Sequence, residues 1–210
     1  MSKIRVHPCP QNRNLHVMSL QLPGWFSKVK NNLCHRTGVK ALKKIFDAGA
    51  IMPNDGSFPY TYPQPKASFA RIHNLVSLFD LSKRTEDECL KQIHDWYRFF
   101  FDHKPVTLVI LLDRKLLTAN LMTNEKAVEI TKGTFDPIFL PHVEAFYPQP
   151  IPCRAFTGYL IICSVYEAIY EYIPHRGAFP EIFRKVDEFV QKHIDIYLDP
   201  LNKLEKELEK

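Results

Sequence analysis

Short apolar runs recur along the chain and predict β-strands. Runs bounded by turn residues, which are typical of strands, occupy residues 3–7, 15–22, 33–37, 74–81, 106–113 and 142–147. The run at 106–113 is continuous and rich in β-branched residues, so we expect it to be a central strand buried on both faces. Residues 127–131 are a weaker strand candidate, and residues 116–122 predict a turn or a further strand.

Other segments have the spacing of amphipathic helices. Four helices are predicted, at residues 38–48, 86–103, 156–172 and 179–198, with a single helical turn at 25–29. Gly49 follows the first helix as a C′ residue. Thr85 and Glu88 form a capping box before the second helix.

This order of elements predicts an α+β fold in a single domain that spans residues 1–210. The core is expected at about residues 33–152, and residues 156–210 are expected to form a helical C-terminal extension. Residues 52–66 contain four Pro and three aromatic residues. Such a stiff loop is predicted to cover the mouth of a cleft.

Composition narrows the class of protein. The chain has 210 residues, 45% of them apolar, and a net charge of +5, which permits a polyanionic partner without requiring one. Its five Cys include no C-x-x-C pair, so reduced thiols in a cytoplasmic protein are expected. We expect neither a signal peptide nor a membrane span, because the first residues lack an apolar stretch and the longest apolar run is short.

Several kinds of site find no support in the sequence. The His residues show no metal-ligand spacing, so no metal site is predicted. The seven Gly are scattered and form no phosphate-binding loop. Cys34 directly precedes His35, but a catalytic dyad requires adjacency in space, and a cysteine hydrolase is therefore disfavoured.

Four motifs in a fixed order carry the functional signal. His35-x-Thr37 ends a short strand, and a helix then runs to Gly49. The later segments are the strand at 76–80, the apolar run that ends in Asp113 and is followed by Leu116-Leu117, and a strand with Glu144 followed by Pro150-Ile151-Pro152.

This order, over about residues 33–152, resembles the ADP-ribosyltransferase-like fold, and most of all the DNA-ADP-ribosylating toxins of bacterial toxin–antitoxin systems and their uncharacterised relatives. The resemblance implies a split, mostly antiparallel sheet and NAD as a substrate. It implies a nucleic-acid or protein acceptor, an antitoxin protein as a partner, and no role for a membrane.

The resemblance also implies roles for single residues. Glu144 would be the catalytic carboxylate, with Arg84 as a second catalytic residue. The residues that would bind NAD are His35, Thr37, Ser77, Phe79 and Arg71. This sequence departs from the family pattern at Ala41, where family members often have Asn, and at the arginine, because neither Arg71 nor Arg84 aligns uniquely.

Plainer interpretations of the same residues remain open. His35 can be a locally bonded turn residue, Glu144 can lie on a solvated strand face, and Arg84 can form an ion pair at the start of a helix. The whole chain can instead be a non-catalytic module that binds nucleic acid or protein, or an inactive relative that serves as a scaffold. In the first case the binding residues would be Lys28, Lys30, Lys40, Lys43 and Lys44.

Overall fold

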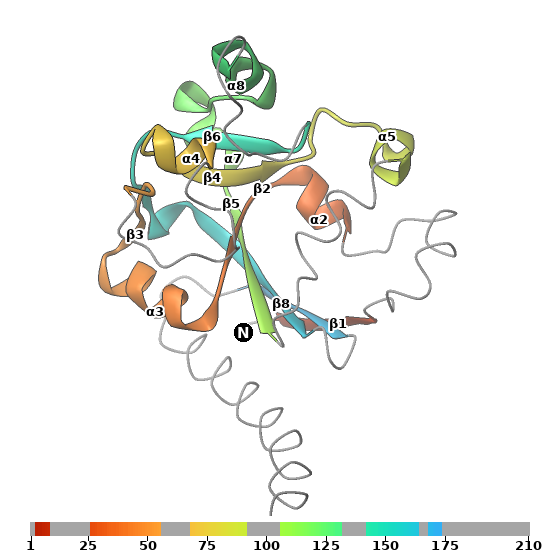
Figure 1. Ribbon diagram of the computed structural model, residues 1–210. Helices are drawn as coiled ribbons and strands as arrows, with labels where there is room; N and C mark the ends of the chain where they lie inside the picture. Colours follow the sequence, from red (N-terminus) through yellow and green to blue (C-terminus); the bar gives the residue numbers. More distant parts are fainter. Residues whose placement is uncertain are drawn as a thin grey trace, which may run out of the picture. The chain divides into compact units, whose positions relative to one another are not determined.

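The computed structural model describes residues 3–8, 26–55, 68–91, 106–131, 142–163 and 168–173. All of them belong to one compact unit, Lys3–Ile173, which combines helices with antiparallel sheet (Figure 1). The predicted α+β class is therefore confirmed. The prediction of a single domain also covers residues 174–210, including the predicted helix at 179–198, and these lie outside the described residues.

The main sheet has seven strands in the order β1-β9-β8-β5-β2-β4-β6, and all neighbours are antiparallel. The strands are β1 (Lys3–Pro8), β2 (Leu33–Thr37), β4 (Val76–Asp80), β5 (Val106–Leu112), β6 (Glu144–Tyr147), β8 (Phe156–Cys163) and β9 (Ala168–Ile173). Five of the predicted strands are thus confirmed, with β1 at an edge, where Pro8 is tolerated. The predicted strand at 15–22 lies outside the described residues.

β5 is a central strand, as its continuous apolar run predicted. Between Thr107 and Leu112 its residues are at most 4% exposed. It pairs with β2 on one side and with β8 on the other. Burial on both faces explains why this strand shows no alternation of apolar and polar residues.

β2 is the strand at which the sheet parts. It pairs with β5 over its whole length, from Leu33 to Thr37. With β4 it pairs only at Leu33 and Cys34, opposite Asp80 and Phe79. In Figure 1, β4 and β6 run across the direction of β5 and β8, and β2 passes from one pair to the other.

A second, two-stranded sheet joins segments that are distant in the sequence. β3 (Ala50–Ile51) pairs with β7 (Ile151–Pro152). The backbone N–H of Cys153 also donates to the Gly49 carbonyl oxygen at 3.0 Å. Gly49 has a φ of 69°, a left-handed conformation that Gly adopts without strain, so its predicted role after the helix is confirmed.

Short helices surround the strands. They are α2 (Phe26–Asn31), α3 (Val39–Asp47), α4 (Phe69–Ile72), α5 (Glu86–Lys91), α7 (Arg114–Leu117) and α8 (Asn124–Thr131), with 3₁₀ turns η3 (Thr118–Asn120) and η4 (Cys153–Ala155). The predicted capping box of α5 is present. The Glu88 carboxylate accepts from the Thr85 N–H at 2.8 Å, and the Thr85 hydroxyl oxygen accepts from the Glu88 N–H at 3.2 Å. Of the predicted helix at 86–103, residues 92–103 lie outside the described residues.

The predicted helix at 156–172 is wrong, because its described residues, 156–163 and 168–172, lie in strands β8 and β9. Tyr159, Leu160, Ile161 and Ile162 are at most 5% exposed, so β8 is buried on both faces. A short run that is apolar on both faces does not distinguish a strand from a helix by its period, and the pairing with β5 decides for the strand. The expected helical extension at 156–210 therefore does not begin at residue 156.

The strand expected at 127–131 is also wrong, because these residues belong to helix α8. Asn124 and Ala127 are buried, whereas Val128 and Ile130 are 40% and 42% exposed. The β-branched residues suggested a strand, but the contact of one helical face with the core prevails. A turn or strand was expected at residues 116–122. Helix α7 and the turn η3 occupy residues 114–120, and Met122 forms an isolated bridge with Phe146. The Asp113 carboxylate caps α7 by accepting from the Lys115 N–H at 2.9 Å.

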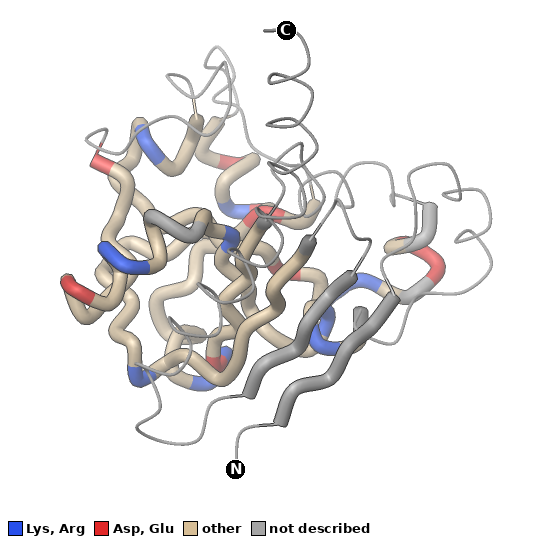
Figure 2. Tube along the Cα trace, turned by 90° about the horizontal axis from the view of Figure 1, so that it is seen from below, with Lys and Arg blue, Asp and Glu red and all other residues tan. Residues whose placement is uncertain are grey.

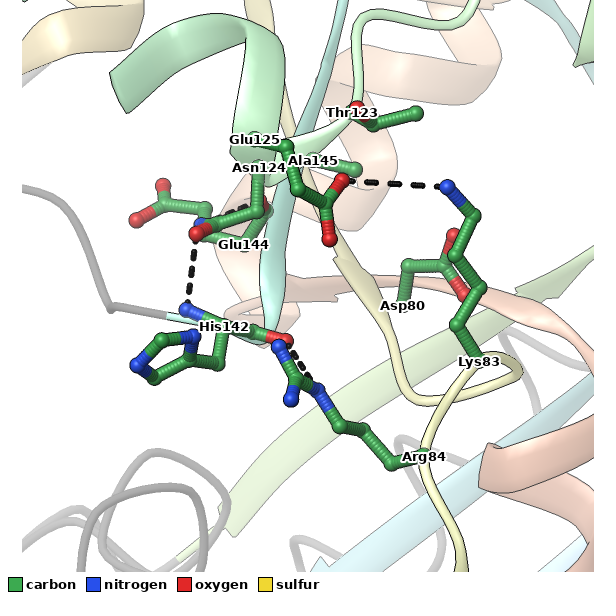
Figure 3. A pocket seen from close by; sticks show the side chains of 9 residues that line it. All are labelled: Asp80, Lys83, Arg84, Thr123, Asn124, Glu125, His142, Glu144 and Ala145. Carbon is green, nitrogen blue, oxygen red and sulfur yellow. Dashed lines mark hydrogen bonds and ion pairs between the residues drawn. The ribbon is translucent and has the colours of Figure 1, made fainter. Parts of the chain in front are cut away.

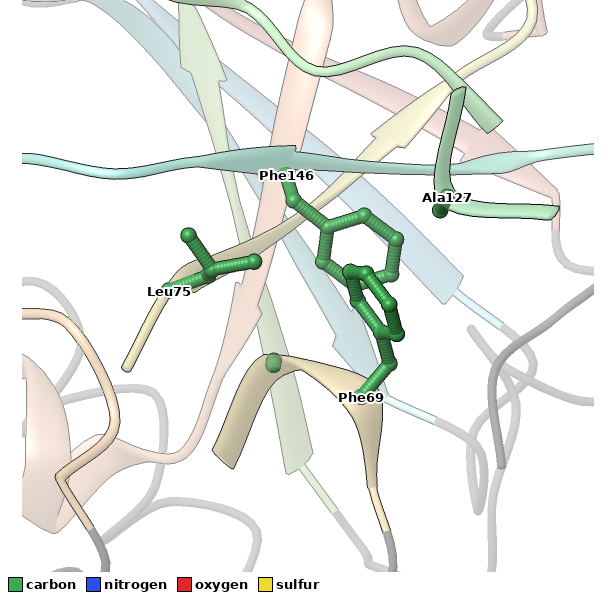
Figure 4. Packing of buried hydrophobic residues seen from close by; sticks show 5 residues of the cluster. Phe69, Leu75, Ala127 and Phe146 are labelled. Carbon is green, nitrogen blue, oxygen red and sulfur yellow. The ribbon is translucent and has the colours of Figure 1, made fainter. Parts of the chain in front are cut away.

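A small core cluster lies between β6 and helices α4 and α8 (Figure 4). It consists of the buried residues Phe69, Ala70, Leu75, Ala127 and Phe146. The rings of Phe69 and Phe146 lie 4.7 Å apart between centroids and are tilted by 50°. Both side chains are fully buried, so this contact fixes α4 against the strand that carries Glu144.

We expect Phe146→Ala to lower the free energy of unfolding by about 3–5 kcal/mol, because it leaves a cavity against Phe69 and Ala127. Urea denaturation followed by circular dichroism measures the change. Val128→Ala, at an exposed position of α8, is the control and should change stability by less than about 0.5 kcal/mol. An equal effect of the two substitutions would show that the cluster does not stabilise the fold.

Candidate functional site

The site begins where β2 leaves β4. The backbone pairing between these strands ends at Cys34. The next residue, His35, contacts β4 through its side chain instead. Its Nδ1 lies 3.0 Å from the backbone oxygen of Ser77 on β4. The imidazole ring thus bridges the two strands at the point where they part.

The partner of His35 defines the state of its ring. A carbonyl oxygen only accepts hydrogen bonds, so Nδ1 carries the proton, and in the neutral ring Nε2 is an acceptor. Burial lowers the pKa of His35 below its ordinary value of 6.5, and the bond to Ser77 opposes this shift only in part. His35 is therefore a neutral imidazole at physiological pH.

Ser77 also connects to the next strand. Its hydroxyl donates to Glu144 Oε1 at 2.5 Å. Glu144 is the first residue of β6 and is paired with Phe79 of β4. Two hydrogen bonds thus join three predicted residues from three adjacent strands. Ser77 contacts His35 through its backbone oxygen and Glu144 through its hydroxyl.

The register of the strands determines which side chains share a face. Cys34 is paired with Phe79, and Phe79 with Glu144, so all three lie on one face of the sheet together with Ser77. Arg36 follows Cys34 by two residues in regular pairing with β5 and so also lies on that face. Sequence reasoning missed Arg36. Alternation within residues 33–37 was the signal that could have found it, but only with the strand pairing known.

The other predicted residues occupy different surroundings. Phe79 is 1% exposed, so it supports the site from the core. Thr37 ends β2 opposite Leu108, and Arg71 lies on α4. Arg84 precedes α5 and donates from Nε to the backbone oxygen of His142 at 3.3 Å. Its Nη1 is also 4.0 Å from the Glu88 carboxylate. This is the ion pair at the start of a helix that the sequence offered as the alternative to a catalytic role.

A small polar hollow lies beside the start of β6 (Figure 3). The hollow is open to solvent, and its empty volume, which includes part of that solvent, is about 270 Å³. The residues that line it are Asp80, Lys83, Arg84, Thr123, Asn124, Glu125, His142, Glu144 and Ala145. Within it Glu125 is directed toward Lys83, at 3.7 Å, whereas the Glu144 carboxylate is directed away from Lys83 and Arg84. The two residues predicted as catalytic, Glu144 and Arg84, therefore border one hollow without pairing across it.

Glu125 serves the start of helix α8. Hydrogen bonds from its own backbone N–H and then from the Thr123 hydroxyl lower the pKa of its carboxyl group. These contacts and the pairing with Lys83 account for this carboxylate without a ligand. Glu125 thus differs from Glu144, whose carboxylate accepts from a hydroxyl on a neighbouring strand.

Cys34 is not suited to act as a nucleophile. The residue is fully buried, and its Sγ lies 3.8 Å from the backbone oxygen of Val29. Burial raises the pKa of its thiol far above the ordinary range. A neutral, enclosed thiol agrees with the expectation against a cysteine hydrolase.

Comparisons with protein-family models, with curated proteins and with solved structures found no match. The geometry of the site must therefore support any functional argument on its own.

Two further observations apply to the described ranges alone. Their His, Cys, Asp and Glu side chains form no group of three or more that could hold a metal ion. None of the helices within these ranges has the length and apolar character needed to cross a membrane.

Part of the 52–66 loop falls outside the described residues, from residue 56 onward. Its beginning is described. The backbone N–H of Asn54 donates to the Leu75 carbonyl oxygen at 3.0 Å, immediately before β4. The loop therefore starts beside the strand that carries Ser77, and its predicted place over the site stays a prediction.

The partly buried, neutral ring of His35 should make folding stability depend on pH. Because its folded-state pKa lies below the unfolded value, its contribution is fully present above pH 6.5 and is lost as pH falls toward the lowered pKa. In His35→Asn the amide nitrogen replaces Nδ1–H without titrating. We expect urea denaturation between pH 7.5 and pH 5 to show a steeper loss of stability in the parent than in this variant.

If parent and His35→Asn lose stability equally over this range, His35 is not held neutral by the fold.

Proposed function

We propose that this protein is an NAD-dependent ADP-ribosyltransferase in which Glu144 is the catalytic carboxylate. The acceptor is a nucleic acid or a protein, and the activity is that of a cytoplasmic toxin controlled by an antitoxin protein. The proposal includes a split sheet of the ADP-ribosyltransferase type. The early parting of β2 from β4 after Cys34 supports it.

One observation carries the proposal. His35, Ser77 and Glu144 were selected from the sequence as NAD-binding or catalytic residues. The first and the last of them lie more than one hundred residues apart in the chain. They lie on three adjacent strands and are connected by hydrogen bonds of 3.0 Å and 2.5 Å. His35 contacts the backbone oxygen of Ser77, and Glu144 contacts its hydroxyl. Polar groups from distant segments that meet at one residue are what an active site requires.

The chemistry needs a positioned carboxylate. In the proposed reaction the bond between C1′ of the ribose and the nicotinamide nitrogen breaks, and its electron pair leaves with nicotinamide. A lone pair of the acceptor forms the new bond to C1′, and the acceptor proton passes to a base. Glu144 would stabilise the positive charge that develops on the ribose and receive that proton. Ser77 would hold the carboxylate in place, and Nε2 of His35 would accept a hydrogen bond from a ribose hydroxyl.

Arg36 is the arginine that the register favours for the pyrophosphate of NAD. It shares a sheet face with Ser77 and Glu144, whereas Arg84 donates to the backbone of His142. A guanidinium group can bind a phosphate with two parallel hydrogen bonds. Arg36 thus replaces Arg71 and Arg84 as our candidate for this contact.

The alternative of a basic binding module receives less support. Figure 2 shows Lys and Arg distributed over many segments of the described trace and interleaved with Asp and Glu. A nucleic-acid-binding module is expected to gather its basic residues on one face or stripe.

Incubation with labelled NAD and single-stranded DNA, RNA or cell lysate tests the proposal. We expect the parent to release nicotinamide and label an acceptor, and Glu144→Gln to lower the rate by about 10²–10³-fold, because one positioned group contributes this much to the transition state. NAD affinity should change little, since Gln keeps the shape and one acceptor.

Glu125→Gln is the matched control, because it removes a carboxylate from the same hollow that is already engaged at the start of α8. It should keep the rate of the parent within about 2-fold. Equal rates for the parent and Glu144→Gln would rule out Glu144 as the catalytic carboxylate. Salt-dependent binding of nucleic acid without NAD turnover would favour the binding module instead.

A separate prediction concerns the arginine. Arg36→Lys keeps the charge but loses the bidentate geometry, so we expect the KM for NAD to rise about 10-fold with kcat nearly unchanged. The same measurement on Arg71→Lys and Arg84→Lys compares the three candidates. A larger rise in KM for either of these variants would identify that residue, and not Arg36, as the one that binds the pyrophosphate.

A further inference from the structure

Asn124 is a buried polar side chain that the proposed mechanism does not yet use. It is 7% exposed, begins helix α8 and lies beside the start of β6. Its Nδ2 donates to the backbone oxygen of Glu144 at 2.9 Å, and its Oδ1 accepts from the backbone N–H of His142 at 2.8 Å. Both ends of the amide are therefore bound to the segment that carries the proposed catalytic carboxylate, and this fixes the orientation of the amide.

The register explains why a side chain is needed here. Met122 and Phe146 form an antiparallel bridge in which each N–H donates to the other's oxygen, at 2.8 Å and 2.9 Å. Two residues outward from such a bridge, Asn124 lies opposite Glu144. Because helix α8 begins at Asn124, its backbone turns away, and the side-chain amide supplies the partner that a continuing strand would have given.

His142 shows that the chain is forced to turn at this point. Its φ is 66°, in the left-handed region that residues other than Gly rarely adopt. Its N–H is held by Asn124, and its carbonyl oxygen is held by Arg84. A strained residue that is fixed on both sides and lies just before a candidate catalytic residue is the kind of outlier that indicates a functional constraint.

The other edge of β6 is held as well. The Asp80 N–H donates to the Val143 carbonyl oxygen at 2.7 Å, and Glu144 is paired with Phe79. The backbone around Glu144 is thus fixed between β4 on one edge and Asn124 on the other. Since the backbone sets the direction of a strand side chain, loss of one edge would turn the carboxylate away from the Ser77 hydroxyl.

We propose that Asn124 is a positioning residue for the Glu144 carboxylate, and that its paired hydrogen bonds to His142 and Glu144 set the rate of transfer rather than the affinity for NAD. This inference rests on the proposed function. Asn124 acts through the backbone of β6 and touches no reacting atom.

Asn124→Asp is the first test. Asp keeps the shape and the acceptor for His142 but loses the donor to Glu144 and places a carboxylate oxygen against a carbonyl oxygen. We expect kcat to fall about 10–100-fold, since a small misplacement of a catalytic group has effects of this size. The KM for NAD should stay within about 3-fold of the parent. Leu75→Val, in the core cluster behind β6, destabilises the fold without removing these bonds and should keep kcat.

A second pair of variants tests the positioning of Glu144 while Asn124 and both of its hydrogen-bond partners are retained. His142→Gly adopts the left-handed conformation without strain, whereas His142→Val opposes it. Only the backbone of His142 bonds Asn124 and Arg84. We therefore expect kcat of the Gly variant to stay within about 3-fold of the parent and kcat of the Val variant to fall at least about 10-fold.

The outcomes separate this inference from the proposed function. A parent that consumes NAD together with an Asn124→Asp variant of equal kcat would overturn the inference alone. An equal loss of kcat in Leu75→Val would overturn it too, because general destabilisation would then explain the effect. If Asn124→Asp does not fold, equal kcat values of the two His142 variants overturn it. A parent that consumes no NAD under any condition overturns the proposed function and this inference with it.

Discussion

The hydrogen bond between the His35 ring and the Ser77 carbonyl oxygen is the contact on which the site depends. β2 and β4 stop pairing after Cys34, and a backbone carbonyl oxygen that loses its ladder partner in a partly buried place costs free energy. The imidazole supplies that partner at 3.0 Å, and its burial keeps the ring neutral. The two parts of the sheet can therefore diverge while they remain connected at one point.

Ser77 extends this connection to the third strand. Its backbone oxygen is bound to β2 and its hydroxyl to Glu144 on β6, so one residue links the two sides of the opening. A displacement of β4 would change both contacts together. The position of the carboxylate is thus coupled to the position of the histidine ring by a short series of bonds within the sheet.

Beside this series, apolar packing holds β6 in place. Phe146 lies on the Phe69 ring and beside Ala127, and Met122 bridges the same strand. Helices α4 and α8, although short, are thereby fixed against β6 by side chains that are almost fully buried. The polar contacts at the start of the strand and the apolar contacts along it act on the same four residues of β6.

The local elements follow from the amino-acid sequence alone. The continuous run of β5, the amphipathic face of α3 with Gly49 after it, and the capping box of Thr85 and Glu88 each follow from side-chain pattern and backbone preference, and each is present. Those signals act over a few residues, so they can be read without the fold. The selection of His35, Ser77 and Glu144 as candidates came instead from the resemblance of the order of motifs to a known family.

Tertiary structure decided the rest, because it depends on contacts between distant segments. β8 is apolar on both faces, and only its place beside β5 shows that it is a strand. Residues 127–131 carry β-branched side chains but form a helix, because Ala127 packs on the Phe146 cluster. The roles proposed for Asn124 and Arg36 follow only from the register of the strands. A pattern along the chain fixes which side of an element is apolar, but the pairing of strands fixes which polar residues meet.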